Sequence, residues 1–160
     1  MYIAHGTFYM GHITMASTTH SISFPRAQYF ERFYAAFDAA LTHAVASEQP
    51  LSMALFDVDL FGTLNENHGR ERADAVLEWL SGALGESFGS RAEVVRYGGD
   101  AFAAILPGVE KEEAFLLAES ARGAIGGGGI VYDGDQTLKF SLTVSAGLAS
   151  YPDDGATCVD

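Results

Sequence analysis

Cysteine and long apolar runs are scarce in this sequence. Cys158 is the single cysteine among 160 residues, which excludes a disulfide framework and a cysteine-based zinc site. This usage fits a reducing compartment, and we expect a cytoplasmic protein. No apolar stretch approaches the ~18 residues of a membrane span, so we expect no membrane insertion.

Positive charge is also scarce. Nine Lys and Arg residues face 21 Asp and Glu residues, and the formal net charge is −12. A protein this acidic is a poor match for nucleic acid or an anionic membrane surface. One phosphate pocket stays open to it, because backbone N–H groups and metal ions can hold a phosphate without net basic charge.

The length corresponds to one domain, and the 48% hydrophobic content is sufficient for a core. Residues 1–23 hold three of the five histidines, and we interpret this stretch as a leader or tag-like segment. The folded domain is expected over 24–153, followed by a tail at 154–160.

Apolar spacing predicts the elements of this domain. A helix is expected from Pro25 to about Ser47, a buried strand over 51–58, a turn-rich stretch over 65–69 and a second helix over about 73–84. A hairpin should follow over 94–106, with Gly98-Gly99 supplying positive φ in a two-residue turn. A third helix is expected over 110–125. A last β region should run over 130–149, turning at 133–135 and then continuous from 138.

The order of these elements predicts the fold class. The core pattern β-α-β-β-α-β is ferredoxin-like, an α/β (α+β) arrangement with a central antiparallel sheet flanked by helices. Asp57 and Asp59 lie at the end of its first strand, and Asp100 lies in the hairpin turn. Neighbouring strands would bring these carboxylates to one edge, where hard oxygen ligands suit Mg²⁺ shared with substrate phosphates. Gly98 and Gly99 would let a phosphate or ribose approach the backbone closely.

Three ordered blocks carry a resemblance to a known family. The segments FDVDLFGTLNENHGRERADAVL, RYGGDAF and LTVSAGLASYP resemble the GGDEF domains of diguanylate cyclases, over roughly 24–152. The resemblance implies a nucleotidyl-cyclase-like palm in which two domains each present one GTP and join them into cyclic di-GMP. It therefore implies bacterial signal transduction, a homodimer for any catalysis, and Mg²⁺ with Mn²⁺ as an alternative ion.

The resemblance also implies roles for individual residues. Catalysis would fall to Asp57 and Asp100, and the same two carboxylates with the Val58 carbonyl would hold the metal. A guanine base would be read along its polar edge by an amide and a carboxylate. The residues implied for GTP binding are Asn65, Asp74, Phe61, Gly98 and Gly99.

Several positions depart from the family pattern, so that the signature is degenerate. Ala101 replaces the second acidic residue of the signature, and Gly62 replaces a lysine that contacts phosphate. A further C-terminal helix of the family has no counterpart before Asp160. The early family block is also degraded, at 21–27.

Three functions stay open on these residues. The first, which we favour, is a weakly active or inactive domain that binds GTP or acts as a regulatory or dimerisation module. The second is an active diguanylate cyclase that tolerates Ala101 and Gly62. The third is a structural scaffold without nucleotide. The sequence does not identify a sensory or effector protein.

Overall fold

The computed structural model describes residues 25–133 and 136–154. The leader expected over 1–23 lies outside the described residues, as does all of the expected tail except Asp154. Within the described ranges, no helix has both the length and the apolar character needed to cross a bilayer.

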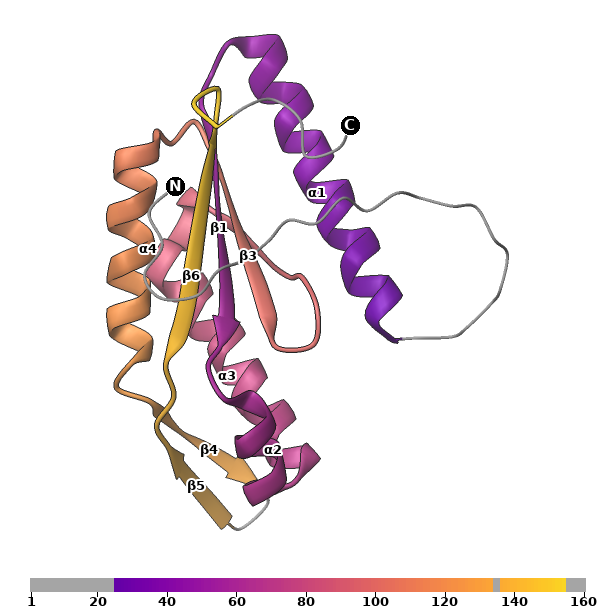
Figure 1. The fold of residues 1–160 in the computed structure, drawn as a ribbon, viewed down its shortest axis with the longest axis vertical. Helices are drawn as coiled ribbons and strands as arrows, with labels where there is room; N and C mark the ends of the chain where they lie inside the picture. Colours follow the sequence, from indigo (N-terminus) through magenta and orange to yellow (C-terminus); the bar gives the residue numbers. More distant parts are fainter. Residues whose placement is uncertain (1–24, 134–135, 155–160) are drawn as a thin grey trace.

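A four-stranded antiparallel sheet forms the centre of the molecule (Figure 1). Its strands are β1 (Leu51–Val58), β2 (Glu93–Arg96), β3 (Ala101–Pro107) and β6 (Val144–Tyr151). The order across the sheet is β2-β3-β1-β6. Because β1 lies between β3 and β6, both ends of this strand contact segments from the second half of the chain. The predicted ferredoxin-like order of helices and strands is confirmed.

The two faces of the sheet carry different helices, because successive side chains of a strand point to opposite faces. Ala54 and Phe56 of β1 belong to the larger core, under α3 (Arg70–Phe88) and α4 (Lys111–Ile125). Leu51 belongs to a second core under α1 (Pro25–Ser47), with Phe33 as the most buried α1 aromatic. Asp57 has the same parity as Leu51, so it lies on the α1 face.

A small separate hairpin follows α4, and it corrects one prediction. β4 (Gly129–Asp133) pairs with β5 (Gln136–Phe140), whereas the continuous strand expected from 138 to 149 is broken at 141–143 before β6 begins. Trp79 of α3 attaches the hairpin to the domain, with its ring centroid 5.0 Å from that of Phe140. Phe140 at the end of β5 and Leu142 within the break are both buried in the larger core, so apolar packing continues where the strand pairing stops.

Two expected turns also differ from the structure. The stretch over 65–69 is mostly helical: α2 (Phe61–His68) continues to Gly69, whose φ of 82° provides the break before α3. The amides of Thr63 and Leu64 both donate to the Leu60 carbonyl, so the helix begins directly after the β1 carboxylates. The hairpin connection is longer than two residues, because Arg96 pairs with Phe102, and Gly98 does not adopt positive φ.

Candidate nucleotide and metal site

The two strands that carry the predicted catalytic carboxylates are neighbours. Asp57 pairs directly with Ala101 in the β1–β3 ladder, so Asp100 lies one residue beyond that pair. The Val58 amide donates a 3.3 Å hydrogen bond to the Asp100 carbonyl, which ties the end of β1 to the hairpin turn. The expected convergence of Asp57 and Asp100 at one edge of the sheet is therefore confirmed.

The surroundings of Asp57 disfavour the charged form of its carboxyl group. Burial raises the pKa of the Asp57 carboxyl above its ordinary value, and the nearby charges of Asp100 and then Asp59 raise it further. Asp57 is only half-buried, so water screens part of this repulsion. A divalent cation at this edge would relieve the repulsion among the three carboxylates.

Asp59 is held by hydroxyl groups. Its Oδ2 accepts a 2.6 Å hydrogen bond from Thr143 Oγ1, and its Oδ1 accepts a 2.7 Å bond from Ser145 Oγ. The Asp59 amide also donates to the Thr143 carbonyl at 3.0 Å. These three bonds join the end of β1 to the start of β6, which is a structural role. Thr143 and Ser145 were not predicted from the sequence, although their alternation with apolar residues was visible.

The turn at 97–100, which contains Gly98, Gly99 and Asp100 and is called the signature turn below, is held by the Arg96 side chain. Its Nε donates to the Gly99 carbonyl at 3.1 Å and to the Gly98 carbonyl at 3.4 Å, and its Nη2 also donates to Gly99. The amides of Tyr97 and Gly98 donate to the Ala101 carbonyl at 2.8 and 3.2 Å. The guanidinium is therefore committed to the turn, in agreement with a structural rather than a substrate-clamping role.

The residues expected to bind GTP beyond the turn lie on the two helices that follow β1. Asn65 of α2 and Asp74 of α3 are both exposed, on helices that pack against each other. Phe61, the first residue of α2, is half-buried and packs against the larger core. The helix pair thus presents an amide and a carboxylate to solvent beside the carboxylate edge. Their GTP-binding role stays a prediction, and the sequence did not predict the helix that carries Asn65.

Positions 62 and 101, where the sequence predicts departures from the family pattern, differ in their surroundings. Gly62 is exposed, and a Cβ placed on it would meet no heavy atom within 4 Å. Ala101 is half-buried and its cross-strand partner is Asp57. A longer side chain at position 62 would extend into open space, whereas an acidic one at position 101 would enter the field of Asp57.

The oxygen donors at this edge suit a Mg²⁺ ion that is shared with substrate phosphates. The described residues contain no group of three His, Cys, Asp or Glu side chains that could enclose an ion. Mg²⁺ commonly takes one or two carboxylates and completes its shell with water and substrate phosphates. Asp57 and Asp100, with the Val58 carbonyl, match that pattern. The observation that supports it is the raised pKa of Asp57, caused first by burial and then by the charges of Asp100 and Asp59.

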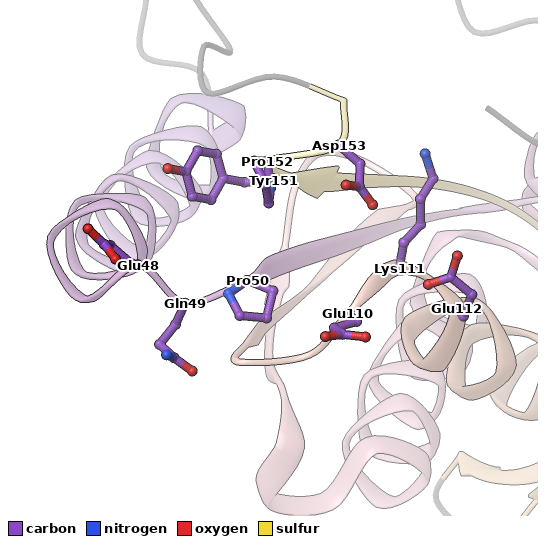
Figure 2. Close-up of a pocket in the computed structure, with 9 residues that line it drawn as sticks. All are labelled: Glu48, Gln49, Pro50, Glu110, Lys111, Glu112, Tyr151, Pro152 and Asp153. Atoms are coloured by element: carbon purple, nitrogen blue, oxygen red, sulfur yellow. The ribbon is translucent and has the colours of Figure 1, made fainter.

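A hollow of about 480 Å³ lies at the opposite end of the sheet (Figure 2). It is formed where β1 begins and β3 and β6 end, roughly 20 Å along the strand from Asp57. Lys111, at its rim, forms a 2.7 Å ion pair with Asp154. Its acidic lining side chains are Glu48, Glu110, Glu112 and Asp153. None of the predicted site residues contributes to this hollow.

Comparisons with known proteins place the chain in a family. Residues 31–160 match the family model described as diguanylate cyclase, GGDEF domain. Diguanylate cyclase A of Treponema denticola is 30% identical over 104 residues, which are 65% of this chain and 27% of that protein. The chain therefore spans about a quarter of the length of that relative.

Solved structures agree on the fold. The GGDEF domain of PA1120 from Pseudomonas aeruginosa superposes with a TM-score of 0.71 at 23% identity, over 79% of this chain and 78% of that one. The active GGEEF domain of a diguanylate cyclase from Vibrio cholerae gives a TM-score of 0.65 at 28% identity, over 75% and 74%. These superpositions agree with the family-model match over residues 31–160, and the chain belongs to the GGDEF family.

Proposed function

We propose that this chain is a GTP-binding module of cyclic di-GMP signalling whose cyclase activity is weak or absent. One observation carries the proposal: the cross-strand partner of Asp57 is Ala101. The site keeps one carboxylate on β1 and one in the turn, and it has a methyl group where a further acid would face Asp57. Such a site suits nucleotide binding better than turnover, because catalysis depends on interactions that strengthen in the transition state.

The residues present have distinct tasks in this proposal. Asn65 and Asp74 bind the guanine edge, and their donor and acceptor pattern disfavours adenine. The half-buried ring of Phe61 packs beside the phosphates, and the turn backbone at Gly98 and Gly99 lies beneath them. A bound Mg²⁺ would neutralise phosphate charge, held by Asp57, Asp100 and the Val58 carbonyl.

The glycine at position 62 is the reason we expect weak phosphate binding. The glycine there offers no cation, and losing a charge-assisted hydrogen bond to phosphate lowers binding by about 1.5–3 kcal/mol. Arg70, at the start of α3, is exposed and supplies part of the missing positive charge. The module should therefore bind GTP more weakly than a family member that carries the lysine.

An active diguanylate cyclase is the second candidate. The 30% identity to a relative named diguanylate cyclase favours it, as does retention of Asp57 and Asp100. In that case two copies would each present one GTP. Each 3′-hydroxyl would lose its proton and attack the α-phosphate held by the other copy, breaking the bond to the β-phosphate and releasing pyrophosphate. A regulatory module that pairs with another GGDEF domain would need the same dimer geometry.

Base selectivity is the test of the proposed GTP site. We expect Asn65→Ala and Asp74→Asn to lower GTP affinity by about tenfold each in Mg²⁺ buffer, because each removes a hydrogen bond that reads guanine. Glu86→Gln, an exposed carboxylate near the other end of α3, serves as the matched control and should bind as the unmodified chain. Equal affinity for GTP and ATP, unchanged in both variants, would contradict the proposal.

A further inference from the structure

One aromatic ring in the first turns of α1, that of Tyr29, contacts the arginine that holds the signature turn. The Cζ atom of Arg96 lies 4.8 Å from the centre of the Tyr29 ring, within the range of a cation–π interaction. Nη1 of Arg96 also approaches the Tyr29 hydroxyl at 3.5 Å. Tyr29 is half-buried and lies on the second turn of the helix.

The same guanidinium also holds the signature turn by hydrogen bonds. Arg96 donates to the carbonyls of Gly98 and Gly99, so the ring and the turn are bound to one planar group. The Phe102 ring lies 5.9 Å from Arg96 and provides a second aromatic neighbour. A planar guanidinium that contacts both the Tyr29 ring and these carbonyls has little freedom to move away from the turn.

Two further rings of α1 support this contact. Tyr97, which follows Arg96, packs edge-on against Phe33 at 4.9 Å and against Phe30 at 5.5 Å. Figure 1 shows α1 running along the side of the sheet where β3 lies, and helix contacts to β2 and β3 agree. Next to the signature turn, the contact between α1 and the hairpin therefore includes three rings of α1, the Tyr97 ring and one cation.

We propose that Tyr29 is a positioning residue, which holds Arg96 against the carbonyls of Gly98 and Gly99 and so sets the place of Asp100 beside Asp57. Tyr29 touches neither carboxylate and acts only through Arg96. A shift of the first turns of α1 changes the turn through this chain of contacts. The effect on nucleotide rests on the proposed GTP site, whereas the effect on the turn does not.

Amide hydrogen exchange at Gly98 measures the turn directly and needs no nucleotide. Tyr29→Leu keeps an apolar side chain but removes the ring, and we expect exchange of the Gly98 amide to rise about tenfold. Tyr29→Phe keeps the ring face and should stay within about twofold of the unmodified chain. Tyr34→Leu removes another α1 tyrosine, one that packs edge-on against Phe30 and Phe33, and should leave Gly98 unchanged.

A second measurement uses the unmodified chain, so that an unstable variant does not end the test. The Nε–H resonance of Arg96 should be shifted upfield by the Tyr29 ring and should exchange slowly with solvent. An ordinary Arg96 resonance, or equal Gly98 exchange in Tyr29→Leu and the unmodified chain, would overturn the proposal. So would an equal rise in Tyr29→Phe or in Tyr34→Leu.

GTP titration of the same variants separates this proposal from the proposed function. With both correct, Tyr29→Leu weakens GTP binding about threefold to tenfold and Tyr29→Phe does not. If the unmodified chain binds no GTP while Gly98 exchange still responds to Tyr29→Leu, the positioning role stands and the proposed function falls. If GTP binds and the variants do not differ in exchange, the positioning role falls alone.

Discussion

Ala101 lies directly opposite Asp57 in the antiparallel pair of β1 and β3. Side chains at paired positions lie about 4.5–5.5 Å apart at their Cβ atoms, so position 101 can add a ligand or a charge to Asp57 with little rearrangement. A substitution at position 101 would therefore act directly on Asp57, the carboxylate that the sequence predicts at the centre of the site.

Restoring the two missing groups tests this reading of the signature. We expect Ala101→Glu with Gly62→Lys to create or raise diguanylate cyclase activity, measured as cyclic di-GMP formed from GTP. The lysine alone should strengthen GTP binding by about tenfold to a hundredfold, since position 62 is open and a charge-assisted phosphate contact contributes about 1.5–3 kcal/mol. A double variant that folds, binds GTP more tightly and still forms no product would place the defect elsewhere.

The raised pKa of Asp57 predicts a pH dependence of stability. The folded chain holds this proton more tightly than the unfolded chain, whose carboxyl keeps its ordinary pKa of 3.8. The stabilisation from Asp57 is therefore complete below pH 3.8 and is lost as pH rises through the folded-state pKa. Asp57→Asn should make the chain more stable to urea at about pH 7.5, and the difference should shrink on acidification.

The control for this prediction is Glu78→Gln, which neutralises an exposed carboxylate on α3. Its free energy of unfolding should follow that of the unmodified chain over the same pH range. Millimolar Mg²⁺ should stabilise the unmodified chain and not Asp57→Asn, because the ion binds the charged carboxylate. A destabilised Asp57→Asn at neutral pH would contradict the assigned repulsion.

Gly129 is predicted to be intolerant of any side chain. A Cβ there would lie 2.6 Å from the Trp79 ring, which is itself packed against Phe140. Gly129→Ala should lower the free energy of unfolding by about 1–3 kcal/mol, because the ring must shift in a packed site. Gly85→Ala in α3 is the matched control: a Cβ there meets nothing, and the helix should gain about 0.5–1 kcal/mol. Equal effects at the two glycines would refute the contact.

A buried pair of hydroxyls joins β1 to β6 and to the loop before α4. Ser52 Oγ donates to the Val109 carbonyl at 2.8 Å and lies 2.7 Å from Ser150 Oγ. Ser52→Ala should cost about 1–3 kcal/mol of stability, since it leaves buried polar groups without partners. The control is Ser87→Ala, whose hydroxyl is exposed and bonds within its own helix, and it should change stability by less than about 0.5 kcal/mol.

The sheet and its long helices were predictable from local pattern. The apolar run before Asp57 identifies the buried strand β1. The helical spacing of apolar residues such as Phe33 and Ala44 identifies the face of α1 that packs on the sheet. α2 was missed because it has no buried residue and its polar residues are equally typical of a turn. The break before β6 was missed because Phe140 and Leu142 continue an alternation that the chain does not keep as one strand.

The candidate site was predictable only in part, for a related reason. Motif spacing located Asp57 and Asp100, because the carboxylates lie next to strand and turn signals. The contacts that orient the site join residues far apart in the chain, as Tyr29 and Arg96 do, and no periodicity reports such contacts. The hydrogen bonds from the Thr143 and Ser145 hydroxyls to Asp59 also join residues far apart in the chain.

The central claim is that this chain binds GTP at an edge that is poorly equipped for turnover. The most direct measurement is a calorimetric titration of GTP in Mg²⁺ buffer, with ATP as the control, followed by chromatography of the same sample for cyclic di-GMP. We predict GTP binding without ATP binding and little or no cyclic di-GMP. Product formed at the rate of ordinary family members would contradict the claim, and so would a chain that binds neither nucleotide.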